Sequence, residues 1–217
     1  MTIAIYGRNI DKDDAKVWLL LGRLSAGGAK TYFFKDEILP GTDMVLALGG
    51  DGTFLRAINM LRGREIPIAG INFGRLGFLT SAKVENGENL WIEDLLSGNY
   101  TIQKRMLLKL ESDAVPHGVY PYALNEIAVL KQGLSSMITI ETYVNGELLH
   151  TYEADGLVIA TPTGSTAYSM SAGGPIVEPS ADNIILTPIC AHNLQPRSLI
   201  AAPNRKVEIQ VGRINRR

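Results

Sequence analysis

The first hundred residues alternate between short, unbroken apolar runs and segments in which apolar side chains recur at helical spacing. The apolar runs predict strands at 2–6, 31–34, 44–48 and 66–71, and the helical spacing predicts helices at 13–24, 53–61 and 90–96. Strands without polar alternation are typical of a parallel sheet that helices cover on both faces. We therefore expect residues 1–100 to form an α/β domain with a mostly parallel sheet.

The pattern changes near residue 100, because polar and apolar side chains then alternate along several of the predicted strands. Strands are predicted at 101–111, 122–131, 137–144, 147–153, 157–160, 184–189 and 206–211. Asn145 and Gly146 form a pair that favours a type I′ turn, so the strands on either side of them should make a hairpin. Residues 101–217 are therefore expected to form a β-rich second domain.

The composition is that of an ordinary globular protein: of 217 residues, 46% are hydrophobic and 20% are charged. A formal net charge of −1 gives no electrostatic reason to expect a nucleic acid or a membrane as partner. No apolar run approaches the roughly 18 residues of a membrane span, and the N-terminus lacks the features of a signal peptide. The one cysteine, Cys190, indicates a reducing compartment and is expected to be a small buried residue. We expect a cytoplasmic protein.

A glycine-rich turn, GGDGT at 49–53, separates a buried strand from a helix. Glycines allow a sharp turn and a close approach of a ligand to backbone amides, and the N-terminus of the next helix favours anions. Such a turn lies at the carboxyl end of a strand, where α/β proteins bind ligands. The alternative is a plain turn in which Asp51 and Thr53 cap the helix.

Two further segments combine polar residues with predicted strands. The sequence INFGRLGFLT at 71–80 has glycines on both sides of Arg75, and Phe78 either lines a pocket or belongs to the core. The pair Asn125–Glu126 interrupts an alternating strand, and its side chains need partners if they are buried. Asn125 can pair with a donor and an acceptor on an adenine edge, or it can simply end a loop.

The longest motif, DGLVIATPTGSTAYS at 155–169, runs from a buried strand into a turn rich in hydroxyl groups, followed by Gly173-Gly174-Pro175. A short helix is expected to start near Ser165, so hydroxyls and free helix amides would converge there and suit a nucleotide. The alternative is a cluster of helix caps without a ligand. That alternative explains one or two hydroxyls, but five of the nine residues at 161–169 are Ser or Thr.

Other common signatures are absent from the sequence: there is no P-loop motif, no G-x-G-x-x-G after the first strand, no Cys/His cluster for zinc and no G-x-S-x-G motif. A nucleotide would therefore have to be bound by a different motif.

Taken together, GGDGT, the Asn-Glu pair and TPTGSTAYS with the following Gly-Gly-Pro resemble the NAD kinase family over about residues 44–203. The resemblance implies an N-terminal α/β domain and a β-rich C-terminal domain, with NAD bound in the cleft between them. It implies phosphorylation of NAD to NADP with ATP as donor and a divalent metal ion, usually Mg²⁺. It also implies a homodimer or homotetramer.

The resemblance assigns roles by motif position. Asp51 would be the catalytic acid beside the adenosine ribose 2′-hydroxyl, and Gly50 and Gly52 would shape the phosphate loop. The residues expected to bind NAD are Phe78, Asn125, Glu126, Thr163, Thr166, Ala167 and Tyr168. Asp155, with the stretch from Cys190 to His192 beside it, would reach the nicotinamide end of an NAD held by a neighbouring subunit, although a structural role for His192 is an equal alternative.

Relatives usually continue beyond the strand at 206–211 with further β structure, so the second domain is expected to be incomplete or short. Glu153 stands where relatives often carry Arg or another residue, which leaves the preference for NAD or NADH open. The competing functions are a lipid kinase of the diacylglycerol or sphingosine type, which shares GGDGT, and a non-catalytic sensor of NAD or NADP. The polar motifs and the sequence at 71–80 do not suit an apolar lipid groove.

Overall fold

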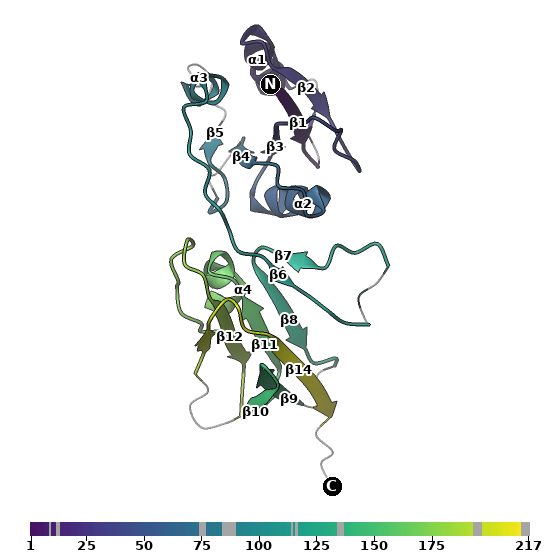
Figure 1. The fold of residues 1–217 in the computed structure, drawn as a ribbon, viewed down its shortest axis with the longest axis vertical. Helices are drawn as coiled ribbons and strands as arrows, with labels where there is room; N and C mark the ends of the chain where they lie inside the picture. Colours follow the sequence, from purple (N-terminus) through teal and green to yellow (C-terminus); the bar gives the residue numbers. More distant parts are fainter. Residues whose placement is uncertain are drawn as a thin grey trace. The chain divides into compact units, whose positions relative to one another are not determined.

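The computed structural model describes residues 1–8, 10–11, 14–73, 77–83, 90–113, 115, 117–133, 137–192 and 197–213. The chain forms two compact units, Met1–Ile102 and Gln103–Arg217, each with its own core (Figure 1). In the described part of the chain, no helix is long and apolar enough to cross a membrane.

The first unit is a five-stranded parallel sheet in the order β2-β1-β3-β4-β5, with helices on both faces. Its elements are β1 (Thr2–Tyr6), α1 (Ala15–Ala26), β2 (Lys30–Phe33), β3 (Met44–Leu48), α2 (Asp51–Leu61), β4 (Ile68–Asn72), β5 (Ala82–Lys83) and α3 (Leu90–Ser97). The predicted parallel sheet is confirmed. The two-residue strand β5 was not predicted, because it is too short to leave a pattern.

Both faces of the sheet are buried, as the unbroken apolar strands predict. Along β1, Ile3 and Ile5 pack against α1 and α3, whereas Ala4 and Tyr6 pack on the side of α2. All five residues of β3 are buried. Because the strands are held from both sides, the turn that follows β3 starts from a fixed position.

The second unit contains antiparallel sheets. Its elements are β6 (Leu108–Lys109), β7 (Tyr122–Ala123), β8 (Glu126–Leu130), β9 (Ile138–Val144), β10 (Glu147–Ala154), β11 (Gly156–Ala160), η1 (Thr163–Thr166), α4 (Tyr168–Ser171), β12 (Ile184–Ile189), β13 (Leu199–Ala201) and β14 (Val207–Arg213). A four-stranded sheet has the order β13-β12-β11-β8 and a three-stranded sheet has the order β10-β9-β14. Apolar residues from the two sheets share one core, which confirms the β-rich fold.

The hairpin between β9 and β10 has the predicted turn. Asn145 has φ 52° and Gly146 has φ 84°, so both central residues lie in the left-handed region that a type I′ turn requires. Val144 and Glu147 pair directly on either side of the turn.

Two of the strands predicted after residue 100 are only partly present in the structure. The alternating stretch 101–111 contains only the two-residue strand β6, and Ile102 is exposed, because no neighbouring strand pairs with residues 101–107. The predicted strand 122–131 is broken at Leu124 and Asn125 into β7 and β8. This break places Asn125 and the start of β8 beside the segment that follows β11. Strand β13 was not predicted.

Candidate functional site

The glycine-rich turn joins the carboxyl end of β3 to α2. Gly49 has φ 145°, and a Cβ atom there would lie 2.5 Å from the Thr53 hydroxyl oxygen, so only glycine fits. The Gly49 amide donates to the Ile71 carbonyl at 2.8 Å, which ties the turn to the end of β4. The turn therefore lies at the carboxyl edge of the sheet, where parallel sheets bind ligands.

The carboxylate of Asp51 holds the loop that follows β4. Its two oxygens accept the backbone amides of Phe78 and Leu79, each at 3.0 Å. A Cβ atom on Gly77 would lie only 2.2 Å from Asp51 Oδ1, so this glycine leaves the space that the carboxylate occupies. A carboxylate has about four acceptor sites, so Asp51 can still accept a hydroxyl group from a ligand.

This arrangement tests whether Asp51 caps the helix that follows the turn. The N-cap of α2 is Gly50, which has no side chain, and α2 begins two residues earlier than predicted. Asp51 therefore lies inside the first turn of the helix and reaches across to the neighbouring loop instead of capping its own helix. The alternative in which Asp51 caps the helix is therefore wrong.

The loop from Gly77 to Thr80 is fixed at both ends but presents an exposed aromatic ring. The Gly77 amide donates to the Thr80 hydroxyl at 2.9 Å, and the Ser81 amide donates to the Gly70 carbonyl at 2.8 Å. Phe78 is 81% exposed, so it does not belong to the core. Residues 74–76, which include Arg75, lie outside the described residues.

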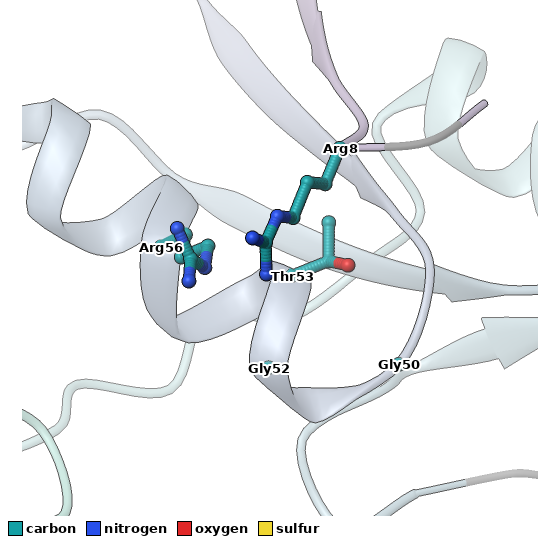
Figure 2. Close-up of a pocket in the computed structure, with 5 residues that line it drawn as sticks. All are labelled: Arg8, Gly50, Gly52, Thr53 and Arg56. Atoms are coloured by element: carbon teal, nitrogen blue, oxygen red, sulfur yellow. The ribbon is translucent and has the colours of Figure 1, made fainter.

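An open cavity of about 350 Å³ lies beside the same turn and is lined by Arg8, Gly50, Gly52, Thr53 and Arg56. Figure 2 shows the Arg8 side chain extending from the end of β1 toward the first turns of α2, where Thr53 and Arg56 lie. The sequence motifs indicate neither arginine, because neither belongs to a recognisable pattern and only the fold brings Arg8 to the helix.

In the second unit, Asn125 lies against the segment that follows β11. The Thr161 amide donates to the Asn125 carbonyl at 2.9 Å, and the Thr161 hydroxyl donates to the Leu124 carbonyl. Gly164 passes so close that a Cβ atom there would lie 2.0 Å from the Asn125 carbonyl oxygen. The polar pair and the TPTGSTAY segment, 36 positions apart between Asn125 and Thr161, thus lie side by side in the fold.

One carboxylate oxygen of Glu126 is the polar atom here that most strongly indicates a ligand. Its Oε2 is buried and has no hydrogen-bond partner among the described residues. Burial raises the pKa of this carboxyl group, and a hydrogen bond from the Tyr168 backbone amide partly offsets that rise. Buried acceptors normally have partners, so an unpaired one beside an open segment indicates a ligand that donates a hydrogen bond.

The five hydroxyl groups between Thr161 and Ser169 do not all face a ligand. Ser165 accepts the Val177 amide at 3.0 Å and donates to the Val177 carbonyl at 3.1 Å. Ser169 bonds to Thr187 at 3.0 Å within the core, and Thr161 is fully buried. These three hydroxyls therefore stabilise the fold of the segment, as the alternative without a ligand predicts.

The remaining two hydroxyls, those of Thr163 and Thr166, take part in longer hydrogen bonds. Thr163 accepts only a long hydrogen bond, 3.4 Å, from Arg105, and Thr166 donates to the Thr163 carbonyl at 3.5 Å. Ala167 is half-buried and the neighbouring Tyr168 is exposed. The regular turns here, η1 and α4, have four residues each, so the expected anion-binding helix end is not formed.

Asp155 and His192 lie at the other end of β11 from Asn125. The five-residue strand β11 separates Asp155 from Thr161, and the six residue steps from one to the other span roughly 20 Å. Lys131 pairs with Asp155 at 2.6 Å, a contact that the sequence did not indicate. The His192 amide donates to the Glu153 carbonyl at 2.8 Å. Within one subunit, these residues therefore form a second group.

Cys190, in the same group, corrects a prediction. It directly follows the end of β12 at Ile189, it is exposed, and its φ of 46° lies in the left-handed region. The prediction of a small buried cysteine is wrong.

The comparisons with known proteins agree with each other. The ATP-NAD kinase N-terminal domain matches residues 9–100 and the ATP-NAD kinase C-terminal domain matches residues 124–217. An NAD kinase of Flavobacterium psychrophilum is 49% identical over 171 residues, covering 78% of this chain and 58% of that protein. An NAD kinase of Porphyromonas gingivalis is 39% identical over 231 residues, covering 96% of this chain and 79% of that protein.

Among solved structures, the crystal structure of an NAD kinase from Archaeoglobus fulgidus in complex with ATP matches with a TM-score of 0.82 and 32% sequence identity. The match covers 97% of this chain and 81% of that one. The chain spans 58 to 62% of the length of the first five curated relatives that it matches.

Proposed function

Because this chain belongs to the ATP-NAD kinase family, we propose that it transfers a phosphoryl group from ATP to the adenosine ribose 2′-hydroxyl of NAD, giving NADP. The observation that carries the proposal is Asp51, a carboxylate fixed at the glycine-rich carboxyl edge of a parallel sheet with acceptor capacity left over. Phosphoryl transfer needs positioning, charge stabilisation and one group that handles a proton.

In the proposed reaction, the 2′-hydroxyl oxygen attacks the γ-phosphorus of ATP. The bond between that phosphorus and the bridging oxygen breaks, and its electron pair leaves with ADP. The hydroxyl proton passes to the Asp51 carboxylate, which the amides of Phe78 and Leu79 hold in one orientation. A carboxylate fixed in this way does not have to be reorganised when the hydroxyl approaches.

The second unit would recognise NAD. The unpaired Oε2 of Glu126 would accept a hydrogen bond from a ribose hydroxyl or an adenine amine, which would remove the cost of a buried acceptor without a partner. Asn125 would read a base edge with its side-chain amide. Phe78, which belongs to the first unit, would offer its exposed ring as a stacking surface. The part of the site that holds the adenine of NAD would be completed by Thr163, Thr166, Ala167 and Tyr168. The part that holds its phosphates would be lined by Gly50 and Gly52.

We also propose that the active form is a homodimer or homotetramer. Asp155 and His192 lie roughly 20 Å from Asn125 along β11, so they are too far away to complete the same end of a site in one subunit. In an assembly they would contact the nicotinamide end of an NAD bound by a neighbouring subunit. Lys131, paired with Asp155, would fix that carboxylate.

The family implies a divalent metal ion, usually Mg²⁺. The described residues contain no group of three or more His, Cys, Asp or Glu side chains that could hold one, and both oxygens of Asp51 already accept amides. The described residues therefore offer no cluster of this size to hold the ion. Mg²⁺ commonly binds through substrate phosphates, and it would then neutralise part of their charge.

The test is a coupled assay for NADP formation from NAD and ATP by the 217-residue chain. We expect turnover, and we expect Asp51→Asn to lower kcat by roughly a hundredfold or more, the usual scale for the loss of a general base. Asp36→Asn removes one exposed carboxylate from the same unit and serves as the matched control. NAD binding without turnover would instead indicate a sensor, and transfer to diacylglycerol a lipid kinase.

A further inference from the structure

We propose that Arg105 sets the direction of the Thr163 hydroxyl, so that this hydroxyl donates a hydrogen bond to N1 of the adenine ring of NAD. Arg105 is a positioning residue in this proposal, since it acts through Thr163. The identity of the ligand rests on the proposed function, whereas the direction of the hydroxyl rests on contacts within the second unit. Arg105 belongs to none of the sequence motifs.

The guanidinium group of Arg105 connects two side chains. Its Nη2 donates to the Gln103 side-chain oxygen Oε1 at 2.7 Å, and its Nη1 donates to the Thr163 hydroxyl oxygen at 3.4 Å. Because the guanidinium is planar, holding one nitrogen also orients the other. Hydrogen bonds from Ser180 and, to a smaller extent, the charge of Arg105 lower the pKa of Glu178, so the guanidinium also lies near that carboxylate. Arg105 therefore presents a cationic donor to Thr163.

The Thr163 hydroxyl has a proton without an acceptor. Thr163 is only 7% exposed, and among the described residues its hydroxyl makes no hydrogen bond other than the one from Arg105. An arginine cannot accept a hydrogen bond, so the Thr163 oxygen is the acceptor in this contact. The guanidinium hydrogens repel the hydroxyl proton and turn it away from Arg105. Since buried donors normally have an acceptor, the proton is available to an acceptor atom of a ligand.

Adenine N1 is the ring atom that suits this donor. In the proposed site, Asn125 would pair with the 6-amino group and N7, the two atoms that an asparagine side chain can bind at once. The ring acceptor on the other side of the amino group is N1. Thr163 directly precedes Gly164, whose Cβ position lies 2.0 Å from the Asn125 carbonyl oxygen. Thr163 and Asn125 are therefore placed to contact neighbouring atoms of one base.

The test measures binding to the full chain by calorimetry with three probes: NAD, its 1-deaza-adenine analogue and its 3-deaza-adenine analogue, in which a C–H group replaces N1 or N3. We expect wild type to bind the 1-deaza analogue roughly tenfold or more weakly than NAD, because the buried hydroxyl then lacks an acceptor. The 3-deaza analogue, which keeps N1, should bind within about threefold of NAD.

The variants separate the hydroxyl from the residue that orients it. In Arg105→Ala, water can enter the vacated space and accept the Thr163 proton, so the preference for NAD over the 1-deaza analogue should fall to within about threefold. Arg105→Lys keeps a cationic donor and should retain most of the preference. Thr163→Val should abolish it, and Arg105→Ala should change it no further in that background. Lys104→Ala removes a neighbouring exposed cation and is the matched control, with the wild-type preference expected.

Equal affinity of the wild-type chain for NAD and the 1-deaza analogue would overturn the proposal. A folded Arg105→Ala chain that keeps the wild-type preference would also overturn it, since a purely structural role would weaken all three probes alike. These measurements need no turnover. A chain that makes no NADP but prefers NAD through Arg105 refutes only the kinase, and a chain that forms NADP without this preference refutes only the role of Arg105. A folded wild-type chain that binds none of the probes refutes both.

Discussion

The substitution Gly77→Ala tests how Asp51 is held. A Cβ atom on Gly77 would lie 2.2 Å from Asp51 Oδ1, 2.7 Å from its Cγ and 2.8 Å from its Oδ2. The backbone of Gly77 is outside the left-handed region, so alanine causes no strain of its own. The methyl group would therefore act only by displacing the carboxylate from the amides of Phe78 and Leu79.

The expected size follows from those two hydrogen bonds. A hydrogen bond to a charged group contributes about 1.5–3 kcal/mol, so losing two costs about 3–6 kcal/mol. Water replaces part of this, because Phe78 is exposed and Asp51 is half-buried. We expect a net loss of roughly 2–4 kcal/mol for the docked loop, and a fall in kcat/KM for NADP formation of roughly 30-fold or more at 1.4 kcal/mol per tenfold.

The assays are urea unfolding and NADP formation, with Gly22→Ala as the matched control. Gly22 lies in α1 with no atom within 4 Å of its Cβ position, so alanine there should stabilise the chain by up to about 1 kcal/mol. Asp51→Ala removes the same two bonds, so the double variant with Gly77→Ala should be no less stable than either single one. Additive losses in this cycle would refute the reasoning.

Three other predictions concern the second unit. Asn125→Ala should weaken NAD binding by roughly 5- to 150-fold, measured by calorimetry, because a bound partner is left unpaired. Burial raises the pKa of Glu126 above 4.5, so the folded chain binds more protons than the unfolded chain just above pH 4.5, and stability falls there as the pH rises. The Glu126→Gln variant has no carboxyl group at this position and should not lose this stability. Its free energy of unfolding relative to that of wild type, measured by urea unfolding, should therefore increase from pH 4 to pH 7. Ser165→Ala should cost about 1–3 kcal/mol through its lost bonds to Val177. The exposed Ser180→Ala should change stability by no more than about 0.5 kcal/mol.

The first unit could be predicted from sequence because its strands carry their own signal. Strand β3 is apolar at every position and buried on both faces, so its pattern and its environment agree. The Asn145–Gly146 turn was equally readable, since its two left-handed residues are the ones that a type I′ turn selects. Residues 101–107 show the limit: they alternate like a strand, but a strand also needs a partner for its backbone groups, and sequence alternation does not reveal one.

The site was less predictable than the fold, since the direction of a polar side chain depends on tertiary contacts. The sequence singled out Asp51 as a candidate, but it did not reveal the bonds to Phe78 and Leu79, which join residues 27 and 28 positions apart. Arg8 belongs to no motif and reaches the cavity only because β1 lies beside β3 in the sheet. A local pattern identifies a turn or a strand, and it does not identify which loop meets it.

Hydrogen-bond capacity separates the two kinds of polar residue in these motifs. The hydroxyls of Ser165 and Ser169 are hydrogen-bonded to Val177 and Thr187, so substitutions of these serines should lower the free energy of unfolding. Glu126 retains a buried acceptor without a partner, and Asp51 retains lone pairs beyond its two amides. Since a ligand can bind only groups with capacity left, substitutions at these two acids should change KM or kcat in addition to any change in the free energy of unfolding. Within one continuous motif such as TPTGSTAYS, the sequence does not show which hydroxyls are hydrogen-bonded within the fold and which can still bind a ligand, because both kinds belong to Ser and Thr.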